Sequence, residues 1–369
     1  MAETISPLSP KARLNAICPY FTMFPLSFPY HVIGASSQTA VVLDPFCGRG
    51  TTLYASRLLG RKAYGIDSSP VAVAVSAAKL AHATPEAVLG ELESALSGPA
   101  APETPRGSFW ASAYHKSTLE EICRVRSFLM ADCSTPSRVL LRALLLGALH
   151  GPLPKKLENA GYLSNQMPRT FASKPSYSER FWRARNLTPP RLQVRSVVAR
   201  RAHRFLREAP PAPEGIVVPG DSRSATSYGG LSGVTTVITS PPYYGLNTYV
   251  TDQWIRNWFL GGPEAPDRQL DKQFSHQSPE AFAADLREVW RNCASVSQPG
   301  ARLVVRFGSI SCRSAVHHET ILGSFDGTRW VLQSVLPAGS AQHGHRQATQ
   351  MRVKTAPREE IDLELKLDA

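Results

Sequence analysis

Residues 41–67 constrain the fold of this 369-residue chain more than any other stretch. They open with the apolar run Val41–Asp44, which is typical of a buried parallel strand. A turn with Gly48 and Gly50 follows, then a helical pattern to about Leu59 and a second strand pattern that ends in an acid, Asp67. A strand, a helix and a strand in this order form a βαβ unit. The sequence therefore predicts an α/β protein with a doubly wound sheet.

The glycine turn suits a nucleotide-like ligand. Gly48 and Gly50 allow close approach of the backbone, a helix that begins near Thr51 favours an anionic group, and Asp67 can bind a ribose diol. The turn lacks both the third glycine of a nicotinamide-binding fingerprint and the Gly-Lys-Ser/Thr of a Walker A loop. Asp44, placed before the glycines, suits a ligand with a cationic amine, such as the methionine end of S-adenosylmethionine.

A second motif, Ser240-Pro241-Pro242-Tyr243, follows directly after the strand-like run 234–239. Two successive prolines cannot extend a strand, since neither has an N–H and both fix φ, so we predict a rigid elbow here. The elbow offers free carbonyls, a hydroxyl and an aromatic face. Together they suit a planar ring that carries an exocyclic amine. Taken alone, the four residues also fit an ordinary Pro-Pro turn.

Together the two motifs resemble those of the S-adenosylmethionine-dependent DNA amino-methyltransferases, which modify N4 of cytosine or N6 of adenine. Residues 44–52 (DPFCGRGTT) are similar to the cofactor motif of that family, and residues 239–243 (TSPPY) are similar to its catalytic motif. A serine before the two prolines is typical of its N4-cytosine enzymes, and Asp or Asn is typical of its N6-adenine enzymes. The resemblance implies a class I methyltransferase, Rossmann-like fold and methylation of cytosine N4, with adenine N6 as the alternative.

The resemblance also implies roles for particular residues. The catalytic residues would be Ser240, Pro241, Pro242 and Tyr243, and Tyr244 and Asn247 would line the base pocket. Residues 23–33 are similar to the segment that precedes the cofactor strand in the family, and residues 216–223 are similar to the strand whose terminal acid accepts from the adenine amine of the cofactor. The implied cofactor-binding residues are Phe24, Asp44, Phe46, Gly48, Gly50, Thr51, Thr52, Asp67 and Asp221.

Two segments rich in helix-breaking residues, 98–107 and 210–215, bracket a region that we expect to be helical. Capping signals predict helices that begin at Thr118, at Thr135 and at the pair Thr188-Pro189. We therefore expect three parts: residues 1–82 as cap and cofactor half, 83–214 as a helical insert, and 215–369 as the catalytic half. Cofactor motif, insert and catalytic motif follow the order of the alpha arrangement of the family, although the insert precedes the Asp221 strand.

The insert carries most of the positive charge. Residues 155–214 hold thirteen Lys and Arg against four Glu, a surplus of nine in a chain whose net charge is +12. Aromatic residues such as Tyr177 and Trp182 interleave with these cations, which suits phosphate contacts combined with base stacking. We predict a target-recognition region that contacts duplex DNA through Arg180, Arg183 and Arg185. A solvated basic helix is the plain alternative.

Other features limit the remaining possibilities. No long apolar span or signal peptide is visible, so we expect a protein of the prokaryotic cytosol, associated with the nucleoid. The six cysteines form no C-x-x-C pair, which argues against zinc and against a disulfide framework, and we expect no metal. An RNA or tRNA base methyltransferase and a non-enzymatic DNA-binding module remain competing interpretations. A cognate restriction endonuclease is a conceivable partner, while the sequence does not indicate the target site or the oligomeric state.

Overall fold

The computed structural model describes residues 9–20, 24–101, 103–168, 174–242, 253–266, 278–308, 314–340 and 359–368. These residues contain a seven-stranded sheet with the order β3-β2-β1-β4-β5-β7-β6. Strands β1 to β5 are parallel, and β7 runs antiparallel to its neighbours β5 and β6. This is the strand order of the class I S-adenosylmethionine-dependent methyltransferases, so the predicted fold is confirmed. The strands are β1 (Val41–Asp44), β2 (Lys62–Asp67), β3 (Gly215–Pro219), β4 (Val234–Thr239), β5 (Ser297–Gly308), β6 (Trp330–Ser340) and β7 (Glu359–Leu367).

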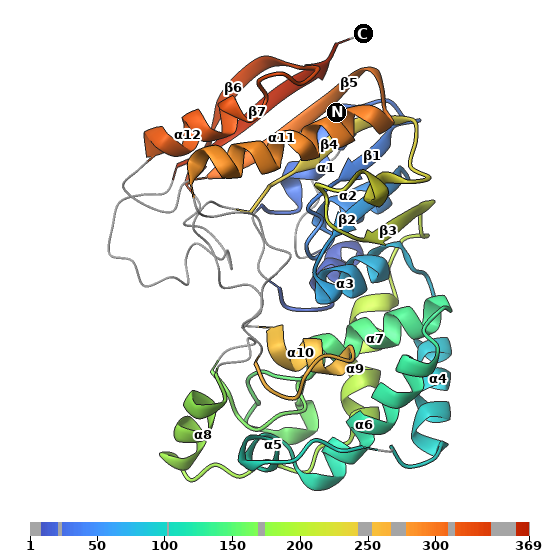
Figure 1. Cartoon of the computed structure of the whole chain (residues 1–369). Helices are drawn as coiled ribbons and strands as arrows, with labels where there is room; N and C mark the ends of the chain where they lie inside the picture. The colour runs from blue at the N-terminus through green and yellow to red at the C-terminus, as the bar shows by residue number, and fades with distance from the viewer. Residues whose placement is uncertain are drawn as a thin grey trace.

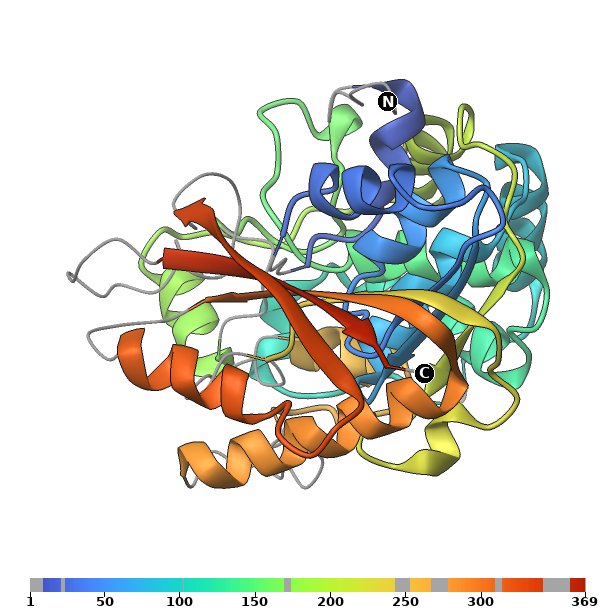
Figure 2. The same ribbon diagram turned by 90° about the horizontal axis from the view of Figure 1, so that it is seen from above.

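Helices cover both faces of this sheet, because neighbouring strand residues point to opposite sides. Val42 and Ile238 pack toward α1 (Ser27–Gly34) and α2 (Thr51–Leu58), and α3 (Pro70–Leu80) lies along β2 and β3. Leu43 and Val237 belong instead to a core that includes residues of α11 (Pro279–Val296) and α12 (Ser314–Gly323). Figures 1 and 2 show the resulting layers.

A second body, made of helices, lies below the sheet in Figure 1. Its helix α10 comes from the predicted catalytic half, yet Trp254 and Trp258 of α10 are buried with their rings 5.6 and 4.5 Å from Trp110. The core of this body therefore crosses the boundary that we predicted after residue 214. Its helices are α4 (Pro85–Ser97), α5 (Ser108–Ala113), α6 (Lys116–Ala131), α7 (Pro136–Ala148), α8 (Pro175–Arg183), α9 (Val194–Leu206) and α10 (Trp254–Phe259).

Helix starts in this body differ in part from the sequence prediction. Thr135 caps α7 as predicted, since its hydroxyl accepts from the N–H of Arg138 at 3.3 Å. The predicted start at Thr118 is wrong: α6 begins two residues earlier, and the Thr118 hydroxyl donates to the carbonyl of Leu192 at 2.7 Å. The start predicted at Thr188-Pro189 is also wrong, because α9 begins at Val194.

The N-terminal 3₁₀ helix η1 (Pro10–Ala16) joins the two bodies. The buried ammonium of Lys79, on α3, donates to the Leu14 carbonyl at 2.6 Å, and Arg201, on α9, donates to the Ile17 carbonyl at 2.5 Å. A Cβ on Gly147 of α7 would overlap that same carbonyl, so this contact requires glycine. None of the described helices is long and apolar enough to cross a bilayer.

Candidate functional site

The turn between β1 and α2 depends on two glycines for different reasons. Both have left-handed backbone conformations, with φ of 51° at Gly48 and 77° at Gly50, which L-residues with a Cβ rarely adopt. A Cβ on Gly50 would lie 2.9 Å from Ser76 Oγ and 3.0 Å from Ser76 Cα, so this glycine allows α3 to pack against the turn. Among the described residues, a Cβ on Gly48 would meet only the Phe46 oxygen, at 3.9 Å. The Gly48 side is therefore the open face of the turn, where a ligand can approach the backbone.

Asp44 ties three elements together at the base of this turn. One carboxylate oxygen accepts from the Phe46 N–H at 3.1 Å and from the Thr239 hydroxyl at 2.7 Å, and the other accepts from the Thr52 hydroxyl at 2.6 Å. Burial raises the pKa of Asp44 to about 6, against the lowering effect of these three hydrogen bonds. A cationic group beside the carboxylate would lower that pKa again, so the position suits a positively charged ligand.

Asp67, at the end of β2, holds the other side of the turn. Its carboxylate accepts from the Gly48 N–H at 2.8 Å and from the Ser69 N–H at 2.9 Å, while burial raises its pKa. The side chain is partly exposed, and each carboxylate oxygen can accept more than one hydrogen bond. Asp67 can therefore orient the turn and still accept from the hydroxyls of a diol.

The end of β4 brings the predicted catalytic elbow to the same edge of the sheet. Thr239, the last residue of the strand, donates to Asp44, and Ser240 follows it with only 6% of its surface exposed. The Ser240 hydroxyl has no hydrogen-bond partner among the described residues. A buried hydroxyl without a partner costs about 1–3 kcal/mol, so this one is available to a bound group. Pro241 and Pro242 follow it, and Tyr243, Tyr244 and Asn247 lie outside the described residues.

The loop after β3 lies against the glycine turn. The Ser222 hydroxyl donates to the Pro45 carbonyl, which places Asp221 beside the turn. The Asp221 carboxylate accepts from the guanidinium of Arg223, with the shortest contact at 2.6 Å, and Arg223 also pairs with Asp285 at 3.0 Å. Asp221 thus lies in the loop after β3, in an ion pair that the sequence did not predict, and its role toward a cofactor stays a prediction.

The remaining predicted cofactor residues are Phe46, Thr51 and Thr52, on or next to the turn, and Phe24, in the segment before α1. Thr51 and Thr52 open α2 and are buried, and Phe46 is partly buried against the sheet core. Phe24 is buried, with its ring 5.1 Å from the ring of Phe28. Eight of the nine predicted cofactor residues thus lie on the turn, on the strands beside it, at the start of α2 or in the loop after β3, and Phe24 lies in the N-terminal segment that leads to α1.

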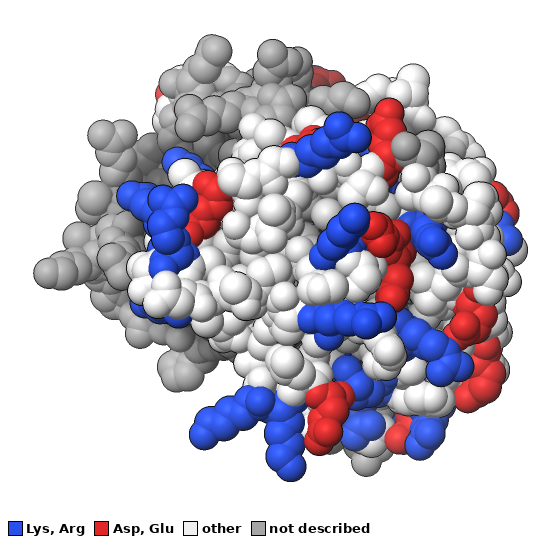
Figure 3. All heavy atoms as spheres, turned by 90° about the horizontal axis from the view of Figure 1, so that it is seen from below, with Lys and Arg blue, Asp and Glu red and all other residues white. Residues whose placement is uncertain are grey.

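The predicted DNA-contacting residues lie on or just after α8. Arg180, Arg183 and Arg185, named here the arginine trio, are all exposed, and none pairs with a carboxylate of the described residues. Figure 3 shows a small group of Lys and Arg side chains on the left, the side on which α8 lies in Figure 1, while further basic side chains are spread among acidic ones over the rest of that face. Arg185 places its guanidinium 4.1 Å from the ring centre of Phe181. The trio is therefore free to meet an anionic partner.

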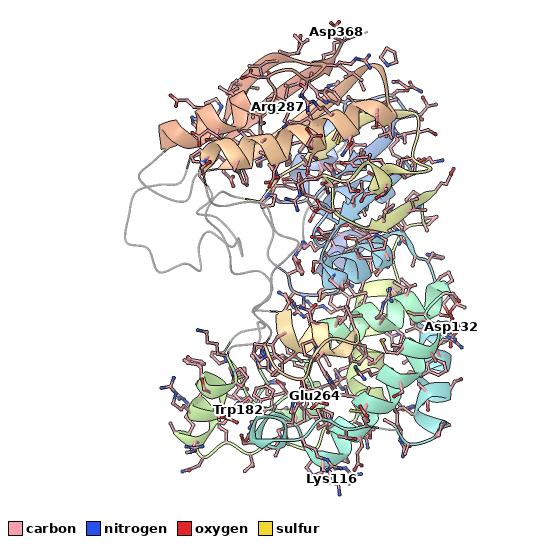
Figure 4. The ribbon with its side chains drawn as sticks, in the orientation of Figure 1. Lys116, Asp132, Trp182, Glu264, Arg287 and Asp368 are labelled. Carbon is pink, nitrogen blue, oxygen red and sulfur yellow. The ribbon has the colours of Figure 1, made fainter. Side chains whose placement is uncertain are left out.

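Trp182 does not take the stacking role that we predicted for the interleaved aromatics. It is 1% exposed, its indole N–H donates to the Gln166 carbonyl at 2.8 Å, and its ring lies 5.7 Å from that of Phe109 on α5 (Figure 4). A ring fixed in this way anchors α8 to the helical body. On the same helix Tyr177 is 50% exposed and Phe181 is partly exposed, so solvent reaches these two aromatic side chains.

Comparisons with known proteins agree with this geometry. Residues 4–78 match the profile of the N6_N4_Mtase family, described as DNA methylase. Over 39 residues the chain is 56% identical to the type II methyltransferase M.EcaI of Enterobacter cloacae, a stretch that covers 10% of this chain and 9% of that protein. In residues 4–78 the chain is thus similar to the N6/N4 DNA methylases.

Two solved structures resemble the chain at low identity. The rRNA methyltransferase aviRa from Streptomyces viridochromogenes is 14% identical with a TM-score of 0.36, and the alignment covers 95% of this chain and 89% of that one. An S-adenosylmethionine-dependent methyltransferase from Methanosarcina mazei is 7% identical with a TM-score of 0.34, covering 92% of this chain and 97% of that one. The strand order of the sheet itself identifies the fold.

Proposed function

We propose, from the family of residues 4–78 and the fold of the whole chain, that this protein methylates an exocyclic amine of a DNA base, and that the amine is N4 of cytosine. The proposal rests mainly on Ser240. Its buried hydroxyl lacks a partner among the described residues and lies at the sheet edge that also bears the glycine turn. A neutral hydroxyl at this place, where the adenine enzymes usually have an acid or an amide, supports cytosine over adenine.

The residues around the turn fit S-adenosylmethionine, the cofactor of this fold and family. The open face at Gly48 admits a ligand to the backbone, Asp67 can accept from ribose hydroxyls, and buried Asp44 favours a nearby cation. When bound, the cofactor supplies a methyl group made electrophilic by its sulfonium. We propose that Phe24, Phe46, Thr51, Thr52 and Asp221 complete the pocket. Asp221 would accept from the cofactor beside its ion pair with Arg223.

The chain's own contribution to the chemistry is mainly positioning. A cytosine inside a duplex cannot present N4 to a pocket, so the base must leave the stack, and Tyr243 would stack on the flipped ring. The Ser240 hydroxyl and the carbonyl that follows it would accept from the N4 hydrogens and align the nitrogen lone pair with the methyl group. With the cofactor bound, transfer of its methyl group would form the N–C bond and break the S–C bond. The methylated amine would then lose a proton to water, so no strong base would be required.

The helical body is the proposed target-recognition part, with the arginine trio on the phosphate backbone of duplex DNA. Its exposed cations without ion-pair partners among the described residues support this assignment, because ion-paired arginines would have to give up those pairs on binding. Tyr244 and Asn247 remain proposed base-pocket residues. A role in a type II restriction–modification system, with a cognate endonuclease, is consistent with the partial match to M.EcaI.

One assay separates the competing functions. The protein is incubated with tritiated S-adenosylmethionine and, in parallel, with duplex DNA, single-stranded DNA and tRNA, and the labelled nucleosides are identified by mass spectrometry. We expect label in N4-methylcytosine from duplex DNA. Label in N6-methyladenine would refute the choice of base, and label in tRNA alone would refute DNA as the substrate. A Ser240→Ala protein run beside it shows whether the label depends on the elbow.

A further inference from the structure

The outer edge of the sheet, at β6, is unusually apolar. Four of the nine large hydrophobic side chains that are exposed among the described residues lie in one six-residue stretch of this strand: Val331, Leu332, Val335 and Leu336, at 43–58% exposure. No charged residue occurs in β6 from Trp330 to Ser340. Edge strands of single-chain proteins usually carry charges that prevent pairing with another chain. This edge lacks that protection over its central residues.

A bulge in β6 decides which of these side chains share a face. Leu332 pairs with Leu365 of β7 and Ser334 pairs with Glu364, so Gln333 is an extra residue in the ladder. Val331 and Leu336 therefore lie on one face of the sheet, where their cross-strand partners on β7 are Lys366 and Asp362. Leu332 and Val335 lie on the other face, where their cross-strand partners on β7 are Leu365 and Leu363. Without the extra residue, strict alternation would put the members of each pair on opposite faces.

We propose that β6 pairs antiparallel with β6 of a second copy of this chain, about a two-fold axis between Gln333 and Ser334. In this register Val331 stands opposite Leu336 of the other copy, and Leu332 stands opposite Val335. Each pair shares a face because of the bulge, so the faces of the two sheets are continuous. The stretch is thus self-complementary, with apolar residues meeting apolar residues and the polar pair meeting at the centre.

The centre of the contact relies on side chains more than on the backbone ladder. The Gln333 amide donates to the Val331 carbonyl of its own strand at 3.0 Å, which already satisfies one backbone acceptor. The aliphatic pairs on both faces then supply the contact, since cross-strand pairs are the stabilising unit of a sheet. This interface lies beyond β7, at the far side of β5 and β4 from the helical body (Figures 1 and 2).

Sedimentation velocity measures the association without reference to activity. We expect the unmodified chain at about 50 µM to sediment as a dimer of the 40.3 kDa protomer. Val331→Glu and Leu336→Lys should each raise the dissociation constant at least about tenfold, because a charge would face an aliphatic side chain. The control Ile216→Lys changes an exposed aliphatic residue on β3, the opposite edge of the sheet, and should leave the dimer intact.

Mixing variants tests the register. A Val331→Glu chain and a Leu336→Lys chain should form a heterodimer, since the two charges would face each other, whereas Val331→Glu mixed with Leu332→Lys should not. Placing Val331→Glu and Leu336→Lys in one chain should restore the homodimer, which also shows that the single variants fold. A monomeric unmodified chain, dimers that survive both single substitutions, or no recovery on mixing the matched pair would each overturn the proposal.

Discussion

Replacing Ser240 by alanine should raise the stability of the protein and lower its activity. The Ser240 hydroxyl is buried and lacks a partner among the described residues, so the folded chain bears a desolvation cost of about 1–3 kcal/mol for it. Alanine removes the hydroxyl and leaves a cavity smaller than a methyl group. We therefore expect the free energy of unfolding to rise by about 1 kcal/mol.

Ser227 provides the matched control for stability. It is equally buried, at 6% exposure, but its hydroxyl donates to the Asp221 carbonyl at 2.8 Å. Ser227→Ala should therefore lower the free energy of unfolding by about 1 kcal/mol, since it removes a hydrogen bond that the Asp221 carbonyl accepts in addition to the one from the Ser224 N–H. Urea unfolding followed by circular dichroism compares both variants with the unmodified chain. The change in the free energy of unfolding should be positive for Ser240→Ala and negative for Ser227→Ala, although the two serines are equally buried.

The activity of Ser240→Ala should change in the other direction. Loss of one buried acceptor for the target amine should slow methyl transfer about 10- to 100-fold, which corresponds to about 1.4–2.7 kcal/mol. Single-turnover methylation of duplex DNA measures this step. If the alanine variant is destabilised as Ser227→Ala is, the hydroxyl has a partner in the folded protein. If the rate is unchanged, Ser240 does not touch the reacting amine, and the choice of cytosine loses its support.

Three further predictions follow from the turn and from α8. The pKa of Asp44 is raised to about 6 in the folded protein, so ionisation of this carboxyl group lowers stability. As the pH rises from 4 to 6.5, the free energy of unfolding should therefore fall more in the unmodified chain than in Asp44→Asn. A cationic cofactor should bind more weakly below about pH 6, where Asp44 is protonated, as calorimetry would show. Gly50→Ala should lower the urea midpoint more than Gly48→Ala, since only the former would place a Cβ within 3.0 Å of neighbouring atoms; equal losses would contradict the packing argument. Alanine at the whole arginine trio should weaken duplex DNA binding, reduce its salt slope by up to about 3 and leave the urea midpoint unchanged, whereas unaltered affinity would exclude the trio from the interface.

The sheet and the glycine turn were predictable because their determinants are local. The run from Val41 to Asp44 needs only its own apolar residues to form a buried strand, and the glycines permit the backbone angles of the turn. The buried face of α8 was also predictable from the sequence. Pro175 is a helix-start residue, and from it Ser178 and Trp182, four residues apart, share one face while the arginines take the other. Trp182 was therefore identifiable as a core residue.

Contacts between distant parts of the chain were not predictable in this way. Trp110 and Trp258 are separated by 148 positions, and nothing in either local pattern indicates that they meet. The breaker-rich segments 98–107 and 210–215, which bracket the expected insert, mark turns but do not report which helices pack together. The pairing of Asp221 with Arg223 is local in sequence, yet it depends on a loop that Ser222 and Pro45 bring against the turn.

Helix α3 contacts both the glycine turn and the N-terminal segment that joins the sheet to the helical body. On one side Ser76 donates to the Gly48 carbonyl at 2.7 Å and leaves room only for glycine at position 50. One turn further along, Lys79 donates to Leu14 in the N-terminal segment that Arg201 of the helical body also holds. Burial pushes the pKa of Lys79 well below its usual value, so its retention in an apolar core is costly unless that carbonyl stays in place. The position of the helical body and the shape of the glycine turn are thus fixed by side chains three residues apart on one helix.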